Sequence, residues 1–338
     1  MKASLKTAIA VVIAAAAVAS GVYVYSLKGQ ESLTVYVADA YTGEAQFLIS
    51  EFHNKTSVPV EPPVSGGSYT DAREISGGAP ASVFISVALN AYTSSFLGSH
   101  SPTWALAFAS DSMVIAYSNL TMTSTVNNIV SLFRDAYDSN SSLIYREAFS
   151  NLTSGNVKIG ISDPISDPAG YRAWIVMEIA GSVLTGNETY FTGRIQGSHS
   201  NVTASSAADL VSPLETGQIQ FLFIYKSAAI TKGLHYVPLN DTFNLGNASL
   251  ASFYSRFQYS AEGQTFTGTP VLLFASVPAN ESTSSIGMKF ISFLINNTAP
   301  LSGFGLILLS TMLLYGSSSS GVLQWALDNS RVVQAGAL

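Results

Sequence analysis

The sequence of 338 residues has no cysteine and little charge. Without cysteine the chain can form no disulfide, use no thiol nucleophile and carry no lipid on an N-terminal Cys. Only 11% of the residues are charged, and the 15 lysines and arginines are scattered, so we exclude a nucleic-acid-binding protein. Ser, Thr, Asn, Gly and Tyr must therefore cover most of the surface, which is unusual for a cytosolic protein.

Catalytic patterns are also missing. No G-x-S-x-G elbow and no phosphate-binding or dinucleotide-binding glycine pattern follows a strand. Acidic pairs such as Glu44 and Glu51 are expected on a solvated helix face. The sequence therefore predicts no enzymatic activity and no cofactor, and a hydrolase is the weakest interpretation. The four histidines do not have metal-ligand spacing: His53, His100, His199 and His235.

Residues 1–31 are predicted to be an export segment and a linker. Two lysines precede an apolar run at 7–27, which is long enough to span a bilayer as a helix. The Ala-Val-Ala at 17–19 also resembles a signal-peptide cleavage site. A cleaved signal and a retained membrane anchor both stay open. Either one places the rest of the chain outside the cell, secreted or at the outer face of the membrane.

Sites for N-linked sugar are dense. Several would arise by chance in a chain rich in Ser and Thr, but together with the export segment they favour a glycosylated outer surface. The asparagines that precede X-Ser/Thr without proline are Asn54, Asn119, Asn140, Asn151, Asn187, Asn201, Asn240, Asn247, Asn280 and Asn296.

The length predicts two lobes, because single hydrophobic cores stop growing near about 250–300 residues. Apolar runs of strand length alternate with helical periods, which is typical of a mainly parallel α/β sheet. Residues 104–118 form two extended pieces broken at 110–112, long enough to cross between lobes, and 269–278 are the expected return. We predict lobe I at 32–111, lobe II at 112–268, and a return to lobe I at 269–338. Residues 301–316 are predicted to form a buried helix rather than a second membrane segment.

Several turns in this pattern are suited to an anion. In open α/β sheets, ligands lie beyond the carboxyl ends of the strands, where helix amino ends present unpaired N–H groups. Asp163 is expected to be an ordinary turn or helix cap, whereas Asp167 is either a cap or a ligand-binding residue. If the turns converge, they would bind a small anion. The candidate contacts are Ala40, Thr42, Ser68, Thr70, Ser86 and Gly170.

Several stretches, in order, resemble the archaeal tungstate/molybdate-binding proteins of ABC importers. They include "LTVYVADAYTGEAQFLISEF", "SGGSYTDAREI", "SDPAGYR", "YKSAA" and "NLGN", and the resemblance covers about residues 33–294. It implies a bilobed type II periplasmic-binding-protein-like fold that closes on an oxyanion and delivers it to a permease and its ATPase. It also implies that Ser68, Ser86 and Asp167 contact the anion, with Tyr225 beside a second carboxylate. We expect a monomer.

The chain departs from that family at the expected ligand positions. The family's His-Ala-Gly-Ser is Val-Ala-Asp-Ala at 37–40, so Ala40 lacks a hydroxyl and Asp39 adds an acid. Ile224 stands where the family has a glutamate, and Asp71 occupies a normally uncharged position. Two hypotheses follow. Asp39 or Asp71 supplies the missing acid and, with Asp167, contacts tungstate or molybdate, or the crevice has changed or lost its ligand.

Two further expectations concern the surroundings of the protein. In an acidic medium, Asp39, Asp71 and Asp167 could be protonated and donate hydrogen bonds to an oxyanion instead of repelling it. The rival to a transport protein is a cell-surface glycoprotein that reuses the binding fold without a ligand. The lost ligand positions and the dense sugar sites favour that rival.

Overall fold

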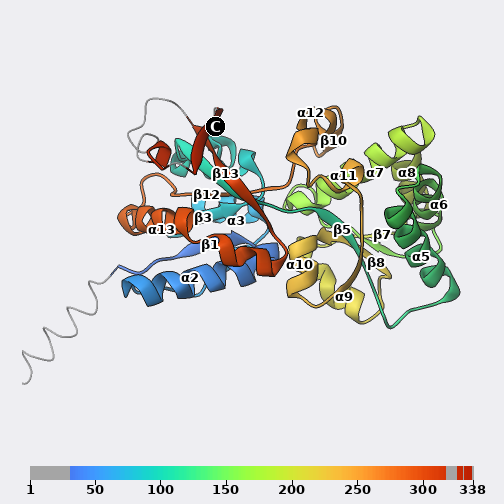
Figure 1. Ribbon diagram of the computed structural model, residues 1–338, viewed down its shortest axis with the longest axis horizontal. Helices are drawn as coiled ribbons and strands as arrows, with labels where there is room; N and C mark the ends of the chain where they lie inside the picture. The colour runs from blue at the N-terminus through green and yellow to red at the C-terminus, as the bar shows by residue number, and fades with distance from the viewer. Residues whose placement is uncertain (1–30, 317–325, 330, 337–338) are drawn as a thin grey trace, which may run out of the picture.

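The structure is a computed structural model that describes residues 31–316, 326–329 and 331–336 (Figure 1). The export segment predicted at 1–31 lies almost wholly outside the described residues. Within the described part, no helix is long and apolar enough to cross a membrane. The described residues form two main sheets, each with its own helices, and a separate two-stranded hairpin. We call the bodies around the two main sheets lobe I and lobe II.

Lobe I is built on a seven-stranded sheet in the order β14-β13-β4-β12-β3-β1-β2. Helices α2 and α13 cover one face and α3 the other, as right-handed crossovers in opposite directions require (Figure 1). The strands are β1 (Val35–Ala38), β2 (Val64–Gly66), β3 (Val83–Ser86), β4 (Trp104–Ser110), β12 (Leu272–Ser276), β13 (Ile307–Gly316) and β14 (Val332–Gly336). The helices are α2 (Thr42–Thr56), α3 (Ser68–Ser76), α4 (Ser94–Leu97) and α13 (Ser284–Asn296), with 3-10 turns η1 (Asp39–Tyr41), η2 (Leu89–Tyr92), η3 (Gly98–His100) and η6 (Ala299–Phe304).

Lobe II is built on a five-stranded sheet in the order β7-β6-β8-β5-β9. Its strands are β5 (Met113–Tyr117), β6 (Ile159–Gly160), β7 (Asn201–Val202), β8 (Phe221–Tyr225) and β9 (His235–Pro238). Its helices are α5 (Ser124–Ser139), α6 (Ser142–Leu152), α7 (Pro168–Thr185), α8 (Tyr190–Ser198), η4 (Ala208–Leu210), α9 (Val211–Glu215), α10 (Lys226–Thr231) and α11 (Asp241–Asn244). A small excursion follows, with η5 (Ala248–Leu250), α12 (Ala251–Tyr254) and the hairpin β10 (Gln258–Ala261) and β11 (Gln264–Thr267).

Helix α7 positions much of the contact between the lobes. Asp167 caps its amino end, Pro168 occupies its first turn, and Gly186 ends it in the left-handed region at φ 72°. Its residues from Pro168 to Gly181 are all buried. A helix that is buried on all sides belongs to the interior of a large protein, so its amino end is held rigidly.

Two chain crossings connect the lobes. The first runs from β4 through Asp111 into β5, with the break where the sequence predicts it. The return passes through Val271 into β12, and the Asp111 N–H donates to the Val271 carbonyl at 3.0 Å. The crossing strands run back against their neighbours, so β12 is antiparallel to β3 and β5 to β8. The sheets are therefore mixed, and the prediction of mainly parallel sheets is wrong in this respect.

The helix predicted at 301–316 is also wrong. Residues 307–316 form strand β13, which pairs antiparallel with β4 and parallel with β14. From Met312 onward, fully buried and partly buried side chains alternate, which is the period of a strand. The strand supplies hydrogen-bond partners to β4, which would otherwise expose an unpaired edge.

Candidate ligand-binding crevice between the lobes

The turn from Ser86 to Ala88, directly after β3, gathers the two serines that the sequence singles out. Ser68 begins α3, is fully buried, and its Oγ accepts a hydrogen bond from the Val87 N–H at 3.4 Å. The Oγ of Ser86 accepts from the Ala88 N–H at 3.0 Å. Two hydroxyls from separate elements of lobe I therefore meet at one turn.

Arg172 reaches this turn from lobe II. It lies on α7, and its guanidinium donates one N–H to the Val87 carbonyl and another to the Tyr225 hydroxyl, each at 2.6 Å. The side chain is 1% exposed, and its Nε has no hydrogen-bond partner among the described residues. A positive charge from one lobe is thus held against the serine turn of the other.

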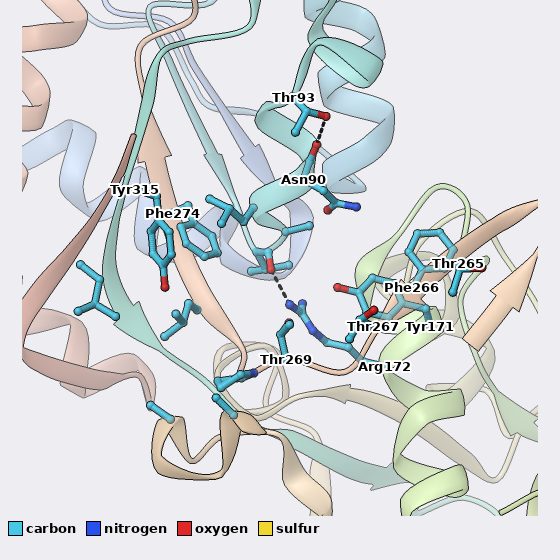
Figure 2. Close-up of a pocket in the computed structure, with 18 residues that line it drawn as sticks. Asn90, Thr93, Tyr171, Arg172, Thr265, Phe266, Thr267, Thr269, Phe274 and Tyr315 are labelled. Atoms are coloured by element: carbon cyan, nitrogen blue, oxygen red, sulfur yellow. Dashed lines mark hydrogen bonds between the residues drawn. The ribbon is translucent and has the colours of Figure 1, made fainter. Parts of the chain in front are cut away.

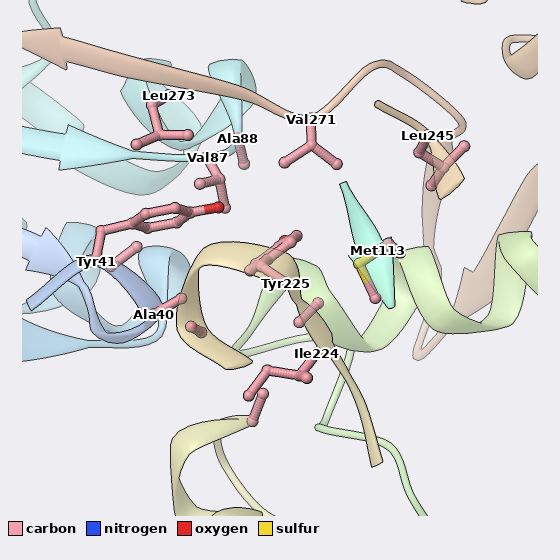
Figure 3. Close-up of a cluster of buried hydrophobic side chains, with 14 of the residues drawn as sticks. Ala40, Tyr41, Val87, Ala88, Met113, Ile224, Tyr225, Leu245, Val271 and Leu273 are labelled. Carbon is pink, nitrogen blue, oxygen red and sulfur yellow. The ribbon is translucent and has the colours of Figure 1, made fainter. Parts of the chain in front are cut away.

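Aromatic side chains pack around the same contact. The rings of Tyr41 in lobe I and Tyr225 in lobe II have centroids 5.7 Å apart, and both residues are 1% exposed (Figure 3). Val87 and Val271 belong to the same buried cluster. The lobes are therefore in direct apolar contact beside the serine turn.

Three aspartates form what we call the acidic cluster: Asp39, Asp71 and Asp167. Burial, followed by the charge of Asp167, raises the pKa of Asp39 to about 7. Burial, followed by the charge of Asp39, raises the pKa of Asp71 to about 8. Burial also raises the pKa of Asp167. In the part of the chain that the structure describes, the Oδ2 atoms of Asp39 and Asp71 have no hydrogen-bond partner, so protonation is the way in which these acids avoid a buried charge.

Asp167 differs from the other two because its oxygens are occupied. One accepts from the Ala169 N–H at 3.0 Å and the other from the Ala207 N–H at 2.8 Å. It is the cap of α7, one of the two roles that the sequence left open. In the described part of the chain, no group of three or more His, Cys, Asp or Glu side chains could hold a metal ion.

Three other residues predicted to contact the anion, Ala40, Thr42 and Gly170, serve packing or backbone structure around these groups. Ala40 is 7% exposed and offers no polar side chain. The Thr42 hydroxyl donates to the Asp39 carbonyl at 2.8 Å and so supports the start of α2. A Cβ at Gly170 would lie 2.1 Å from the Ser162 carbonyl oxygen, so this glycine lets α7 pack against the preceding loop. Ile224 is 1% exposed on β8.

The amino end of α3 also contacts lobe II directly. A Cβ at Gly67 would lie 2.4 Å from the Ser166 carbonyl oxygen, and Arg73 donates to the Ile165 carbonyl at 3.0 Å. The structure therefore has the two lobes closed on each other.

The sequence patterns predicted no functional role for three charged residues of this region: Arg172, Asp111 and Glu44. Arg172 is the last residue of the SDPAGYR stretch that resembles the tungstate/molybdate-binding proteins, and this stretch was the signal that could have indicated it. Asp111 is fully buried in the first crossing, accepts from the Ser227 hydroxyl at 2.5 Å, and has its pKa raised to about 6 by burial.

Glu44 is 2% exposed and burial raises its pKa to about 7, so its predicted position on a solvated face is wrong. The amino end of α2 abuts lobe II, as the approach of Gly43 to Thr231 indicates.

Comparison with known proteins identifies the family. The model of bacterial extracellular solute-binding proteins matches residues 33–300. The chain belongs to this family. It is 33% identical over 304 residues to an uncharacterised solute-binding protein of Saccharolobus solfataricus, covering 87% of this chain and 75% of the relative. Membership implies a location outside the cytoplasm, extracellular or periplasmic, and a role in solute binding rather than catalysis.

Solved structures support the type II binding-protein fold. The periplasmic molybdate-binding protein of Azotobacter vinelandii has a TM-score of 0.55 and 18% identity, covering 82% of this chain and 99% of that protein. The sulfate-binding protein of Mycobacterium tuberculosis has a TM-score of 0.57 and 14% identity, covering 90% of this solute-binding protein and 93% of that chain. At these identities the likeness concerns the fold.

Proposed function

We propose that this protein is the substrate-binding component of an ABC importer and captures an inorganic oxyanion between its lobes, with molybdate or tungstate as the first candidates. The observation that carries the proposal is the meeting of Ser68, Ser86 and the Val87 N–H at one turn, with the Arg172 guanidinium held against it. Hydroxyls, a backbone N–H and a cation are the groups that stabilise a small anion. Two structural neighbours described as binding molybdate and sulfate support the choice of an oxyanion.

Binding would act through closure of the lobes. The serines approach the anion from lobe I and Arg172 supplies positive charge from lobe II, so the anion favours the arrangement in which both are near it. The permease and its ATPase would recognise that closed form. The protein itself is proposed to act as a monomer, secreted or anchored through residues 1–31, and to carry sugar on its outer surface.

The acidic cluster determines how this binding depends on pH. Below the raised pKa values of Asp39 and Asp71, about 7 and about 8, these side chains are neutral and do not repel an anion. Above those values they become charged next to the crevice. We therefore expect oxyanion affinity to fall as the pH rises from 5 to 9.

Calorimetry tests the proposal. The purified protein would be titrated with molybdate, tungstate, sulfate and phosphate, at pH 5 and again at pH 8. Ser68→Ala and Ser86→Ala should each weaken binding by about tenfold, because each removes a hydroxyl that meets the anion. Ser50→Ala on the exposed face of α2 is the matched control. Absence of heat from all four anions at both pH values would rule the proposal out.

A second candidate is a surface glycoprotein that keeps the fold without a ligand. Two observations favour it. Ala40 and Ile224 are buried and carry no ligand atom at the expected positions, and none of the ten candidate sugar-bearing asparagines is buried. This candidate predicts no anion binding together with sugar on several of those asparagines, which mass spectrometry of the native protein measures.

A further inference from the structure

A cavity of about 630 Å³ lies between the lobes, next to the contact of Arg172 with Val87 (Figure 2). Its lobe I wall includes Leu313, Phe274 and Tyr315, and the last two rings pack edge to face with centroids 5.7 Å apart. The opposite wall is the ring pair of Tyr171 and Phe266, stacked at 4.7 Å. The cavity is thus a mainly apolar space between two aromatic pairs.

The charge of Arg172 lies at this cavity, and within the described part of the chain no carboxylate pairs directly with it. Among the described residues, no carboxylate oxygen lies within 4.0 Å of its guanidinium nitrogens. Asp167 is near enough to interact electrostatically, but both of its oxygens accept backbone N–H groups. The faces of Tyr171 and Tyr225 lie 5.3 and 5.7 Å from the guanidinium and offset part of the cost of burial.

Burial makes this arrangement expensive in the absence of an anion. A guanidinium keeps its proton in proteins, so Arg172 cannot become neutral. Although the residue is 1% exposed, its Nε has no hydrogen-bond partner in residues 31–316, 326–329 and 331–336. Groups that satisfy a buried cation are anions that accept hydrogen bonds.

We propose that this cavity binds a small organic anion in which one carboxylate is attached to an apolar body. The carboxylate pairs with Arg172, and the body lies between the ring pair of Phe274 and Tyr315 and that of Tyr171 and Phe266. The volume falls in the range of about 300–1,000 Å³ that is usual for small-molecule sites. An inorganic oxyanion would not use the aromatic walls, so the proposed ligand is of a different class, but Arg172 and Val87 belong to both sites and the two ligands would compete for the guanidinium. Its ligand touches both lobes and favours their closure.

The test uses the full chain and two probes that share one body, 3-phenylpropionate and 3-phenylpropan-1-ol, in calorimetry. The carboxylate should bind at least about tenfold more tightly than the alcohol, since a hydrogen bond to a charged group is stronger than one to a neutral group. Arg172→Gln should remove this preference. Equal binding of the two probes, or no saturable binding of the carboxylate up to millimolar concentration, would overturn the proposal.

A second variant keeps the test decisive if Arg172→Gln does not fold. Leu313→Trp should fill the cavity from the lobe I wall, and Leu313 takes no part in the hydrogen bonds of Arg172 to Tyr225 and Val87. It should abolish binding of 3-phenylpropionate, whereas Leu143→Trp, at a residue 75% exposed on α6, should not change it. Undiminished binding to Leu313→Trp would contradict the proposed site. Leu313 lies outside the serine turn, so molybdate should still bind to this variant, and its heat separates a failure of this site from a failure of the oxyanion crevice.

Discussion

The acidic cluster and the cavity beside Arg172 both contain buried ionisable groups, but the charges of these groups are compensated in different ways. Both use the amino end of α7, where Asp167 and Arg172 lie little more than one turn apart. Both bury ionisable groups with unpaired polar atoms: Oδ2 of Asp39 and Asp71 on one side, Nε of Arg172 on the other. A carboxylate can take up a proton and become neutral, whereas a guanidinium cannot lose one.

This difference assigns different partners to the two regions. The acidic cluster needs only protons, and its raised pKa values mean that it obtains them near neutral pH. Arg172 stays charged at every pH that the protein tolerates, so its partner must be an anion or a set of hydrogen-bond acceptors. The acidic cluster should therefore respond to pH, and the arginine to ligands and to the exact shape of its side chain.

The largest expected effect is on stability as a function of pH. The folded pKa of Asp39 is about 7 and that of Asp71 about 8, against an ordinary 3.8. Their contribution to stability is fully present below about pH 4 and is lost as the pH rises through 7 and 8. One pKa unit corresponds to about 1.4 kcal/mol, so each group should lose about 2 kcal/mol or more between pH 5 and 9. Thermal unfolding across that range would record a falling Tm.

Neutral variants sharpen this first prediction. Asp71→Asn keeps the shape of the side chain but removes its titration, so it should flatten the decline and raise the Tm at pH 9. Asp138→Asn, at an exposed position on α5, is the matched control and should leave the profile unchanged. A Tm that rises between pH 5 and 9 in the unmodified protein would show that the acidic cluster is charged when folded.

Arg172→Lys should have a smaller effect and tests the other half of the comparison. Lysine keeps the positive charge but cannot hold the Val87 carbonyl and the Tyr225 hydroxyl in the fork geometry of arginine. We expect oxyanion affinity to fall by about tenfold, because one charge-assisted hydrogen bond between the lobes is lost. Calorimetry with molybdate measures this. Full affinity in the variant would mean that charge alone matters and that the fork does not.

Most of the fold could be predicted from local sequence patterns. The break at 110–112, the helix at 42–56 and the cap of α7 each follow from short-range signals: a polar interruption, an apolar stripe, and Asp before Pro. Strand β13 could not be predicted, because its state depends on the open edge of β4, about two hundred residues earlier in the chain. A short apolar run fits a buried helix and a buried strand equally well.

The candidate site was less predictable than the fold. Ser68 and Ser86 follow from their places at a helix start and a strand end, and the structure brings them to one turn. The burial of Glu44 depends on how the lobes meet, and so does the lack, among the described residues, of a carboxylate in direct contact with Arg172. No local pattern encodes either. The sequence shows which side chains are polar or charged. Only the packing of the lobes decides whether these side chains find hydrogen-bond or charge partners.

Asp111 offers the finest test of this point, because it is buried like Asp71 but both of its oxygens accept hydrogen bonds. It accepts from the Ser112 N–H at 2.7 Å and from the Ser227 hydroxyl at 2.5 Å, and its pKa rises only to about 6. Asp111→Asn would turn an NH₂ group toward these donors and leave one unsatisfied. We expect a net loss of about 1 kcal/mol at pH 8, seen as a lower Tm. If Asp111→Asn instead stabilises the protein, as expected for Asp71→Asn, these hydrogen bonds do not compensate the buried charge. The distinction between carboxylates with both oxygens hydrogen-bonded and carboxylates with one unpaired oxygen then fails.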